Sequence, residues 1–277
     1  MPGSDEVEEP VLLLRQGAVL TVTLNRPRSK NAMTEEAWAL LGETLRAARA
    51  DDSVRVVVVT GAGGDFCAGA DLKGARSQRH PLVRMHRLSD VALALHEMPK
   101  PVIARVEGVA VGAGWNLALG CDLVVASTTA RFSQIFPRRG LSVDFGGTWL
   151  LPRIVGLQQA KRLALLADFV GADEALRLGL VTWVKTPEQI GTFVDGLAAR
   201  LADGPPVAMA QSKHMLNEAT SQTLREALEA ESRAQVVNFA TDAPAAVQAF
   251  LEGTEPHFEG RWQLRPASPP SEAGTGC

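Results

Sequence analysis

The stretch from Val54 to Thr60 constrains the fold more than any other part of the sequence, because nearly every residue in it is β-branched. Such a run is typical of a strand that is covered on both faces in a parallel sheet. Val102 to Val106 and Leu123 to Ala126 have the same character. Between these runs, Leu82 to Glu97 and Ala113 to Leu119 are predicted helices. Alternating strands and helices predict an α/β fold with right-handed connections up to about residue 150.

The segment before the first buried strand is expected to form a hairpin and a helix. Two short, partly alternating apolar runs, Val11 to Arg15 and Ala18 to Leu24, are separated by Gln16-Gly17. Thr34 then precedes a run to Ala50 with apolar residues at helical spacing, which predicts an N-capped helix.

After residue 158 the pattern changes to one helix after another. The predicted helices cover residues 158–167, 172–178, 187–202, 206–217, 222–238 and 243–252. The last stretch is rich in Pro, Ser and Gly and has too little apolar surface to order itself. We therefore predict a disordered tail at 1–10, an α/β core at 11–200, a helical region at 201–264 and a second disordered tail at 265–277.

Composition excludes several classes of protein. The 28 basic and 31 acidic residues are spread along the chain without a basic stripe, so nucleic acid is not an expected partner. Three cysteines without a CxxC pair favour free thiols in a reducing compartment. The N-terminus lacks the features of a secretory signal, and no apolar run is long enough to span a membrane, so a cytoplasmic location is expected.

Three glycine-rich segments are the candidates for a ligand site. They cover residues 61–72, 108–117 and 140–148, and the first two follow predicted strands. Ligands bind at the carboxyl ends of strands in open α/β sheets, and small residues let backbone N–H groups approach a ligand closely. Two such loops could direct two N–H donors at one oxygen atom.

Other glycine-rich and catalytic motifs do not fit. A dinucleotide-binding GxGxxG pattern that begins at Gly61 would need its third glycine at Phe66. The five histidines do not lie at metal-ligand spacing, and no serine occupies a GxSxG turn, so neither a metal site nor a serine triad is expected. Cys67 is more typical of a small buried residue than of a nucleophile.

Asp144 is the most informative titratable residue. Val143 and Phe145 flank it, which favours a partly desolvated carboxylate with a raised pKa that could act as a base. The alternative is an aspartate that caps a helix beginning near Gly146. The sequence also leaves open whether Asn116 binds a substrate or braces its loop, and it gives Asp71 and Asp122 structural roles.

At these residues the chain resembles the crotonase (enoyl-CoA hydratase/isomerase) superfamily, from about Val11 to Arg261. The matching segments are Leu24 to Pro27, Asn31 to Met33, Phe66 to Leu72, Lys100 to Ala104, Gly112 to Asn116, Cys121-Asp122, Gly146-Gly147 and Gly179 to Val181. The resemblance implies a spiral of βα (ββα) turns with a helical C-terminal trimerisation region. It also implies that the thioester carbonyl of an acyl-CoA accepts hydrogen bonds from the N–H groups of Ala70 and Ala113, which would stabilise an enolate.

The chain departs from the hydratase pattern, which carries two glutamates where Asn116 and Phe136 stand here. Hydration needs a base for water and an acid for the α-carbon, and these two residues supply neither. Asp144 falls where isomerases of the family carry a catalytic aspartate. The segments Gly112 to Gly120 and Asp144 to Pro152 resemble the 1,2-epoxyphenylacetyl-CoA isomerase branch.

The resemblance further implies coenzyme A contacts around the first loop and from a neighbouring subunit, and an apolar acyl pocket. The candidates are Arg26, Arg28, Ala68, Asp71, Leu72 and Lys73 for the loop, Phe258 and Arg261 for the neighbouring subunit, and Trp115, Phe136 and Phe145 for the pocket. Each could equally be a solvated charge or a core aromatic. Coenzyme A would be part of the substrate, no separate cofactor is expected, and the protein should be a homo-oligomer, either a trimer or a dimer of trimers.

Isomerisation through Asp144 is the preferred hypothesis. A hydratase that manages water with Asp144 and Asn116 is the second interpretation. A non-catalytic acyl-CoA-binding protein that keeps the two loops without a working acid and base is the third.

Overall fold

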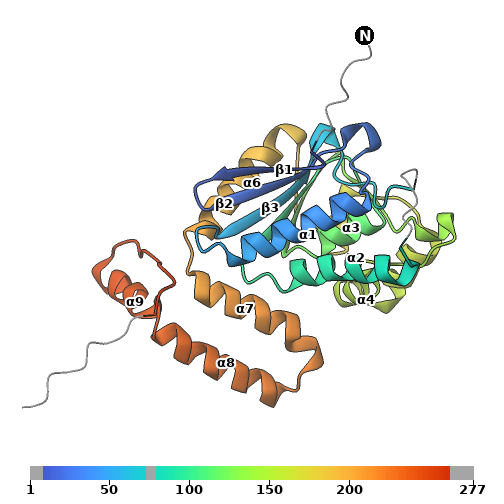
Figure 1. The fold of residues 1–277 in the computed structure, drawn as a ribbon. Coiled ribbons are helices and arrows are strands. Elements are labelled where there is room, and N and C mark those ends of the chain that lie inside the picture. Colours follow the sequence, from blue (N-terminus) through green and yellow to red (C-terminus); the bar gives the residue numbers. More distant parts are fainter. Residues whose placement is uncertain (1–8, 73–78, 263–277) are drawn as a thin grey trace, which may run out of the picture. The chain divides into compact units, whose positions relative to one another are not determined.

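The computed structural model describes residues 9–72 and 79–262 (Figure 1). These residues form two compact units that divide between Ala202 and Asp203. From the sequence, the α/β core was expected to end at residue 200. The candidate loops and Asp144 all belong to the first unit.

The first unit is built on a six-stranded sheet in the order β1-β2-β3-β4-β6-β9. Its strands are β1 (Val11–Gln16), β2 (Val19–Leu24), β3 (Val56–Gly61), β4 (Val102–Val106), β6 (Leu123–Ser127) and β9 (Trp183–Lys185). The first two strands form the predicted antiparallel hairpin, and all the other neighbours are parallel. The carboxyl ends of β3, β4 and β6 therefore lie along one edge of the sheet.

The four consecutive valines of β3 explain why the sheet is covered on both faces. Val57 and Val59 belong to the core that includes residues of α1 (Glu35–Ala50), α2 (Pro81–His96) and α3 (Ala113–Leu119). Val56 and Val58 belong to a second core with α6 (Pro187–Ala202). Alternate strand residues point to opposite faces, and each buried valine contributes about 1.5 kcal/mol or more to stability. The predicted doubly covered strand is confirmed.

Helix α1 has the bounds that its sequence pattern predicts. The Thr34 side chain accepts a hydrogen bond from the Ala37 N–H and so caps the helix, as expected. Its apolar face, which includes Leu41 and Leu45, is fully buried. Trp38 lies on the same helix and reaches toward the candidate site.

A second, three-stranded sheet lies at the candidate site and was not predicted. It consists of β5 (Val109–Val111), β7 (Arg131–Ser133) and β8 (Val170–Gly171) in that order. Strands of two or three residues are too short for an alternating pattern to distinguish them from loops. The same reason explains why β9 was missed.

The helices after β7 lie where the sequence predicts them. Helix α4 (Gly147–Leu166) has a break at Gly156: the part after the break corresponds to the predicted helix 158–167, and the part before it is the helix expected to begin near Gly146. Helix α5 (Ala172–Arg177) follows. Short 3₁₀ turns complete the first unit at η1 (Pro27–Ser29), η2 (Ala62–Gly64) and η3 (Phe136–Arg139).

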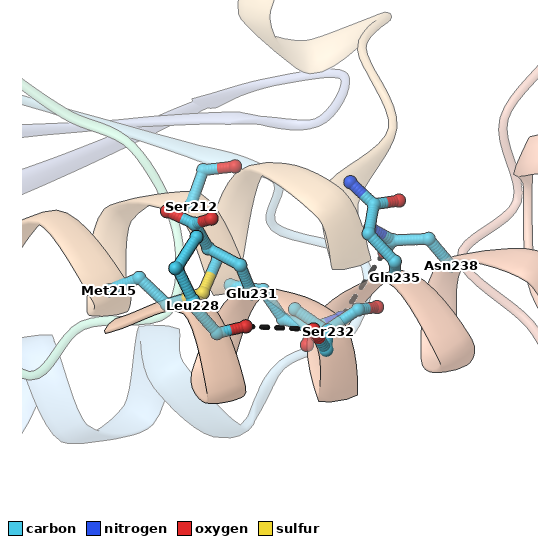
Figure 2. A pocket seen from close by; sticks show the side chains of 9 residues that line it. Ser212, Met215, Leu228, Glu231, Ser232, Gln235 and Asn238 are labelled. Atoms are coloured by element: carbon cyan, nitrogen blue, oxygen red, sulfur yellow. Dashed lines mark hydrogen bonds between the residues drawn. The ribbon is translucent and has the colours of Figure 1, made fainter. Parts of the chain in front are cut away.

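The second unit is helical, as predicted. It contains α7 (Pro206–Glu218), the turn η4 (Ala219–Ser221), α8 (Leu224–Phe239) and α9 (Ala243–Glu252). A capping box between Thr223 and Glu226 begins α8. A hollow of about 300 Å³ between α7 and α8 is lined by Met215, Leu228 and several polar side chains, and it contains none of the candidate residues (Figure 2).

No helix in the described part of the chain has both the length and the apolar character that crossing a bilayer requires.

Candidate active site

The first two glycine-rich loops lie against each other. The Cys67 N–H donates to the Val109 carbonyl at 2.9 Å, and the Val111 N–H donates to the Cys67 carbonyl at 3.0 Å. These bonds join the loop after β3 to β5, which leads into α3. On the other side of the first loop, the Met33 N–H donates to the Gly69 carbonyl at 2.8 Å. The first loop is thus held on both sides by backbone hydrogen bonds.

Two glycines allow this close approach. Gly69 has a φ of +83°, and a Cβ there would lie 2.9 Å from the Val111 carbonyl oxygen and 3.5 Å from the Ala113 amide nitrogen. A Cβ on Gly114 would lie 2.4 Å from the Cys67 carbonyl oxygen. Any larger residue at either position would push the loops apart.

The N–H groups of Ala70 and Ala113 have no hydrogen-bond acceptor among the described residues. Around Ala70, the Ala68 N–H donates to Lys30 and the Asp71 N–H donates to Met33, both at 2.9 Å. Ala113 is the first residue of α3, where helical geometry provides no intrahelical acceptor. Since the loops touch at Gly69, the two N–H groups belong to adjoining segments, and their joint binding of one ligand oxygen, which the family resemblance implies, stays a prediction.

Asp144 precedes α4, and its side chain does not cap that helix. The N-cap is Gly146, which forms no side-chain cap. The Asp144 Oδ1 atom is buried and has no hydrogen-bond partner among the described residues. Burial raises the pKa of the carboxyl from 3.8 to about 6. The structure therefore excludes the capping alternative and gives Asp144 the properties of a base that works near neutral pH.

Asn116 is fully buried in α3, and both of its polar atoms bind protein groups. Its Nδ2 donates to the main-chain carbonyl of Asp144 at 2.8 Å, and its Oδ1 accepts from Gln134 Nε2 at 2.8 Å. Of the two roles that the sequence left open, these contacts favour bracing the Asp144 loop. Gln134 was missed, because nothing in the sequence connects it with residues 18 and 10 positions away.

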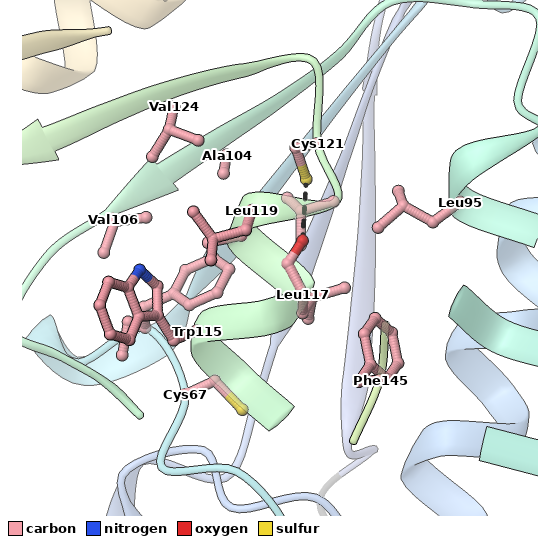
Figure 3. Packing of buried hydrophobic residues seen from close by; sticks show 14 of the residues in the cluster. Cys67, Leu95, Ala104, Val106, Trp115, Leu117, Leu119, Cys121, Val124 and Phe145 are labelled. Carbon is pink, nitrogen blue, oxygen red and sulfur yellow. Dashed lines mark hydrogen bonds between the residues drawn. The ribbon is translucent and has the colours of Figure 1, made fainter. Parts of the chain in front are cut away.

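The aromatic candidates lie in different surroundings. Phe145 is buried, has a φ of +48° and packs on Trp38 with ring centroids 5.1 Å apart. Phe136 is buried in η3 and lies close to Gly112. Trp115 is 1% exposed and packs on Phe132, deep in the core beneath the site (Figure 3). The structure thus places Phe136 beside the second loop and Phe145 directly after Asp144, and both Phe145 and Trp115 belong to the hydrophobic core.

The charged candidates of the first loop mostly bind one another. Arg26 forms an ion pair with Asp71 at 2.8 Å and also donates to the Ala32 carbonyl. Arg28 is exposed on η1, and Leu72 is 65% exposed. Asp122 accepts from the Val102 N–H at 2.7 Å, which confirms its structural role.

The structure does not place three of the coenzyme A candidates at the site. Lys73 and most of the two predicted tails lie outside the described residues. Phe258 is half-buried and Arg261 is exposed, and both belong to the second unit. Their contact with coenzyme A from a neighbouring subunit stays a prediction.

Cys67 is a structural residue of the loop junction. Burial raises the pKa of its thiol to about 12, so the thiol is neutral at physiological pH. Its Sγ donates to the Asn31 carbonyl at 3.2 Å and accepts from the Gly69 N–H at 3.4 Å. In the described part of the chain, no three His, Cys, Asp or Glu side chains gather as a metal site would require.

Known proteins are similar to this chain in sequence and in fold. A family model described as enoyl-CoA hydratase/isomerase matches residues 15–261. The 1,2-epoxyphenylacetyl-CoA isomerase of Escherichia coli K12 is 38% identical over 259 residues, which cover 88% of this chain and 95% of that protein. The short-chain-enoyl-CoA hydratase of Clostridium acetobutylicum is 36% identical over 246 residues, which cover 87% of this chain and 94% of that protein.

A solved structure extends the likeness to three dimensions. The crystal structure of an enoyl-CoA hydratase from Mycobacterium smegmatis matches with a TM-score of 0.85 and 35% identity, over 91% of this chain and 99% of that one. The match confirms the crotonase-like α/β fold with its helical C-terminal region. This chain therefore belongs to the enoyl-CoA hydratase/isomerase family, and it is an enzyme of that family.

Proposed function

We propose that this protein is an enoyl-CoA isomerase, which moves a double bond along the acyl chain of a coenzyme A thioester. The observation that carries the proposal is the partly buried carboxylate of Asp144, whose pKa is raised to about 6 and whose main-chain carbonyl is bonded to Asn116 of α3, the helix that follows the second loop. One carboxylate suffices for isomerisation because it can take a proton from one carbon and return it to another.

The proposed reaction begins with the thioester carbonyl oxygen bound by the N–H groups of Ala70 and Ala113. Asp144 removes a proton from the acyl chain, and the electron pair of the broken C–H bond moves through the conjugated system onto that oxygen. The two N–H groups stabilise the resulting enolate, and each such donor can lower the barrier by about 3 to 4 kcal/mol. The protonated Asp144 then returns the proton to a different carbon, and the double bond has moved.

This reaction moves protons only. It consumes no water and changes no oxidation state, so it requires neither a redox group nor a metal ion. Coenzyme A is part of the substrate. Phe136 and Phe145, both buried near the loops, supply apolar surroundings for the acyl chain and keep water from the enolate.

A hydratase is the second candidate, because several relatives carry that name. It would have to work without the two glutamates of the hydratase pattern. The amide of Asn116 is committed to Asp144 and Gln134, and the phenyl ring of Phe136 transfers no proton. These contacts favour isomerisation. A non-catalytic acyl-CoA-binding protein is the third candidate.

The deciding experiment follows 2-enoyl-CoA and 3-enoyl-CoA substrates, aliphatic and aromatic, in deuterated water by mass spectrometry. Double-bond migration without addition of water supports the isomerase, whether or not deuterium enters the product. Rapid addition of water would show that the hydratase interpretation is right. Absence of any reaction would favour the binding protein.

The variant Asp144→Asn tests the base directly. We expect it to lower turnover by about 100- to 10,000-fold while thioester affinity is retained, because the amide keeps the shape of the side chain but accepts no proton. Asp195→Asn, an exposed aspartate of α6, is the matched control and should keep full activity. A binding protein would lose nothing in either variant.

A further inference from the structure

Two buried amide side chains connect the strand β7 to the main chain of Asp144. Gln134 directly follows β7, and Asn116 lies in α3; both are 0% exposed. Gln134 Nε2 donates to Asn116 Oδ1, and Asn116 Nδ2 donates to the Asp144 carbonyl, each at 2.8 Å. The two bonds form a continuous chain that ends at the peptide group of the proposed base.

The Asp144 carbonyl fixes the donor-to-acceptor direction of these two hydrogen bonds. A main-chain carbonyl only accepts hydrogen bonds, so Asn116 must turn its Nδ2 toward Asp144. That orientation leaves Asn116 Oδ1, which also only accepts, facing Gln134. Residue 134 must therefore supply a donor. Gln134 supplies that donor and so stabilises the orientation of the Asn116 amide that the Asp144 carbonyl requires.

The fit around Asn116 leaves no room for another arrangement. A Cβ on Gly147 would lie 2.4 Å from Asn116 Nδ2 and 2.6 Å from Val143 Cγ1, so the amide fills the space beside the first residue of α4. The Gly147 N–H donates to the same Asp144 carbonyl at 3.0 Å. The carbonyl is thus held from two directions, while the Oδ1 atom of the Asp144 carboxyl keeps no protein partner among the described residues.

Gln134 itself is incompletely satisfied. Its Oε1 is buried and has no hydrogen-bond partner within the described part of the chain. A buried acceptor without a donor destabilises the folded state, so stability alone does not account for an amide at this position. Such local violations are expected where a residue serves function.

We propose that Gln134 is a positioning residue for the reaction: through Asn116 it holds the peptide of Asp144 and thereby fixes the direction of the Asp144 carboxyl toward the substrate. This inference rests on the proposed role of Asp144 as the base. Gln134 affects the orientation of the Asp144 carboxyl and does not itself bind the substrate. Replacing Gln134 should therefore reduce turnover more than it weakens substrate binding.

The variant Gln134→Glu provides the sharpest test, because its effect depends on pH. A neutral glutamic acid still donates to Asn116 Oδ1, whereas an ionised one presents only acceptors and forces the Asn116 amide away from Asp144. We expect turnover to stay within about threefold of the parent enzyme near pH 6 and to be at least about tenfold lower near pH 8, with KM changed by less than about threefold. The parent enzyme should instead rise to a plateau over this range.

The variants Gln134→Met and Asn116→Leu test the same two hydrogen bonds without introducing a side chain that titrates. Since Gln134 acts through Asn116, the double variant should turn over no more slowly than Asn116→Leu alone. Ser133→Ala is the matched control, because Ser133 is also 0% exposed and donates one side-chain hydrogen bond, to the Ala167 carbonyl at 2.9 Å. It should lose thermal stability to a similar extent and keep its turnover.

The outcomes separate this inference from the proposed function. If Asp144→Asn abolishes turnover but both Gln134 variants match Ser133→Ala at every pH, the positioning role is wrong and the base assignment stands. Additive losses in the double variant would likewise overturn the role of Gln134. If Asp144→Asn keeps its turnover, the base assignment fails and the positioning role fails with it. Should Gln134→Glu not fold, Gln134→Met and the double variant decide the matter.

Discussion

In the proposed isomerase, the carboxyl of Asp144 removes the proton, and its partial burial sets the pH range in which it can do so. Only the ionised form can accept a proton from the substrate. Because the pKa is raised to about 6, kcat/KM should rise roughly tenfold per pH unit below pH 6 and level off above it. Initial rates measured from pH 5 to 8, over substrate concentrations that saturate the enzyme, give this pH profile of kcat/KM directly. A flat profile would assign proton removal to another group.

The same burial should lower the stability of the folded protein at neutral pH. The folded pKa of Asp144 lies above its unfolded value, so the stability contribution is fully present below about pH 3.8 and is lost as the pH rises through about 6. After allowance for partial exposure, we expect Asp144→Asn to raise the free energy of unfolding by about 1 to 2 kcal/mol near pH 8. The gain should shrink near pH 5. Urea denaturation at both values, with Asp195→Asn as control, checks the sign.

Among elements, the junction of the first loop with β5 shows how the backbone creates the donor pair. Gly69 and Gly64 offer a matched comparison, since their φ angles are +83° and +85°. Only Gly69 is crowded: a Cβ on Gly64 meets nothing within 4 Å. Gly69→Ala should reduce kcat/KM by about 100-fold or more by moving the Ala70 and Ala113 donors apart, whereas Gly64→Ala should cost stability from backbone strain alone. Equal effects on kcat/KM in the two variants would mean that the spacing of the loops does not matter.

The sequence is informative where periodicity is long and uninformative where elements are short. The valine run of β3 and the capped helix α1 were predictable, because each carries a pattern that only one packing arrangement satisfies. The strands β5 and β7 were not, since three residues carry no period. Yet these strands deliver Gly112 and Gln134 to the site. Their pairing depends on contacts between distant segments.

The site divides in the same way. Asp144 was singled out by its local sequence, and its pKa is raised as that sequence suggested, whereas the donor roles of Ala70 and Ala113 come from the family resemblance and stay predictions. The engagement of Asn116 could not be predicted, because it depends on Gln134, whose position is set by tertiary packing. The pairing of Arg26 with Asp71 is a further contact that the charges alone did not indicate.

At the scale of the whole molecule, the apolar surface of the second unit predicts association. Leu224, Leu228, Val236 and Phe239 are between 51% and 75% exposed, and at 100° per residue they share one side of α8. On α9, Phe250 is 83% exposed. Large exposed apolar patches mark protein interfaces, and symmetric homo-oligomers are the commonest assemblies. We therefore propose that this surface joins copies of the chain, as expected for a trimer or a dimer of trimers.

Light scattering coupled to size-exclusion chromatography measures the assembly. The parent protein should elute with a mass that is a multiple of three chains. Phe239→Glu combined with Phe250→Glu should dissociate it, because two buried charges without partners would cost more than the interface returns. Circular dichroism shows whether the variant keeps its helices. A folded variant with unchanged mass would contradict an interface at this surface.

The two-amide chain behind Asp144 also limits how this enzyme could exchange one chemistry for another. Introducing the hydratase glutamate by Asn116→Glu would leave the Asp144 carbonyl without its side-chain donor, because a carboxylate can accept the hydrogen bond from Gln134 but has no N–H to give to that carbonyl. We expect this single replacement to lower isomerase turnover, because the Asp144 carbonyl loses one of its two hydrogen bonds. A change from one chemistry to the other at this site is therefore expected to need coordinated replacements at residues 116, 134 and 144, whose effects should not be additive.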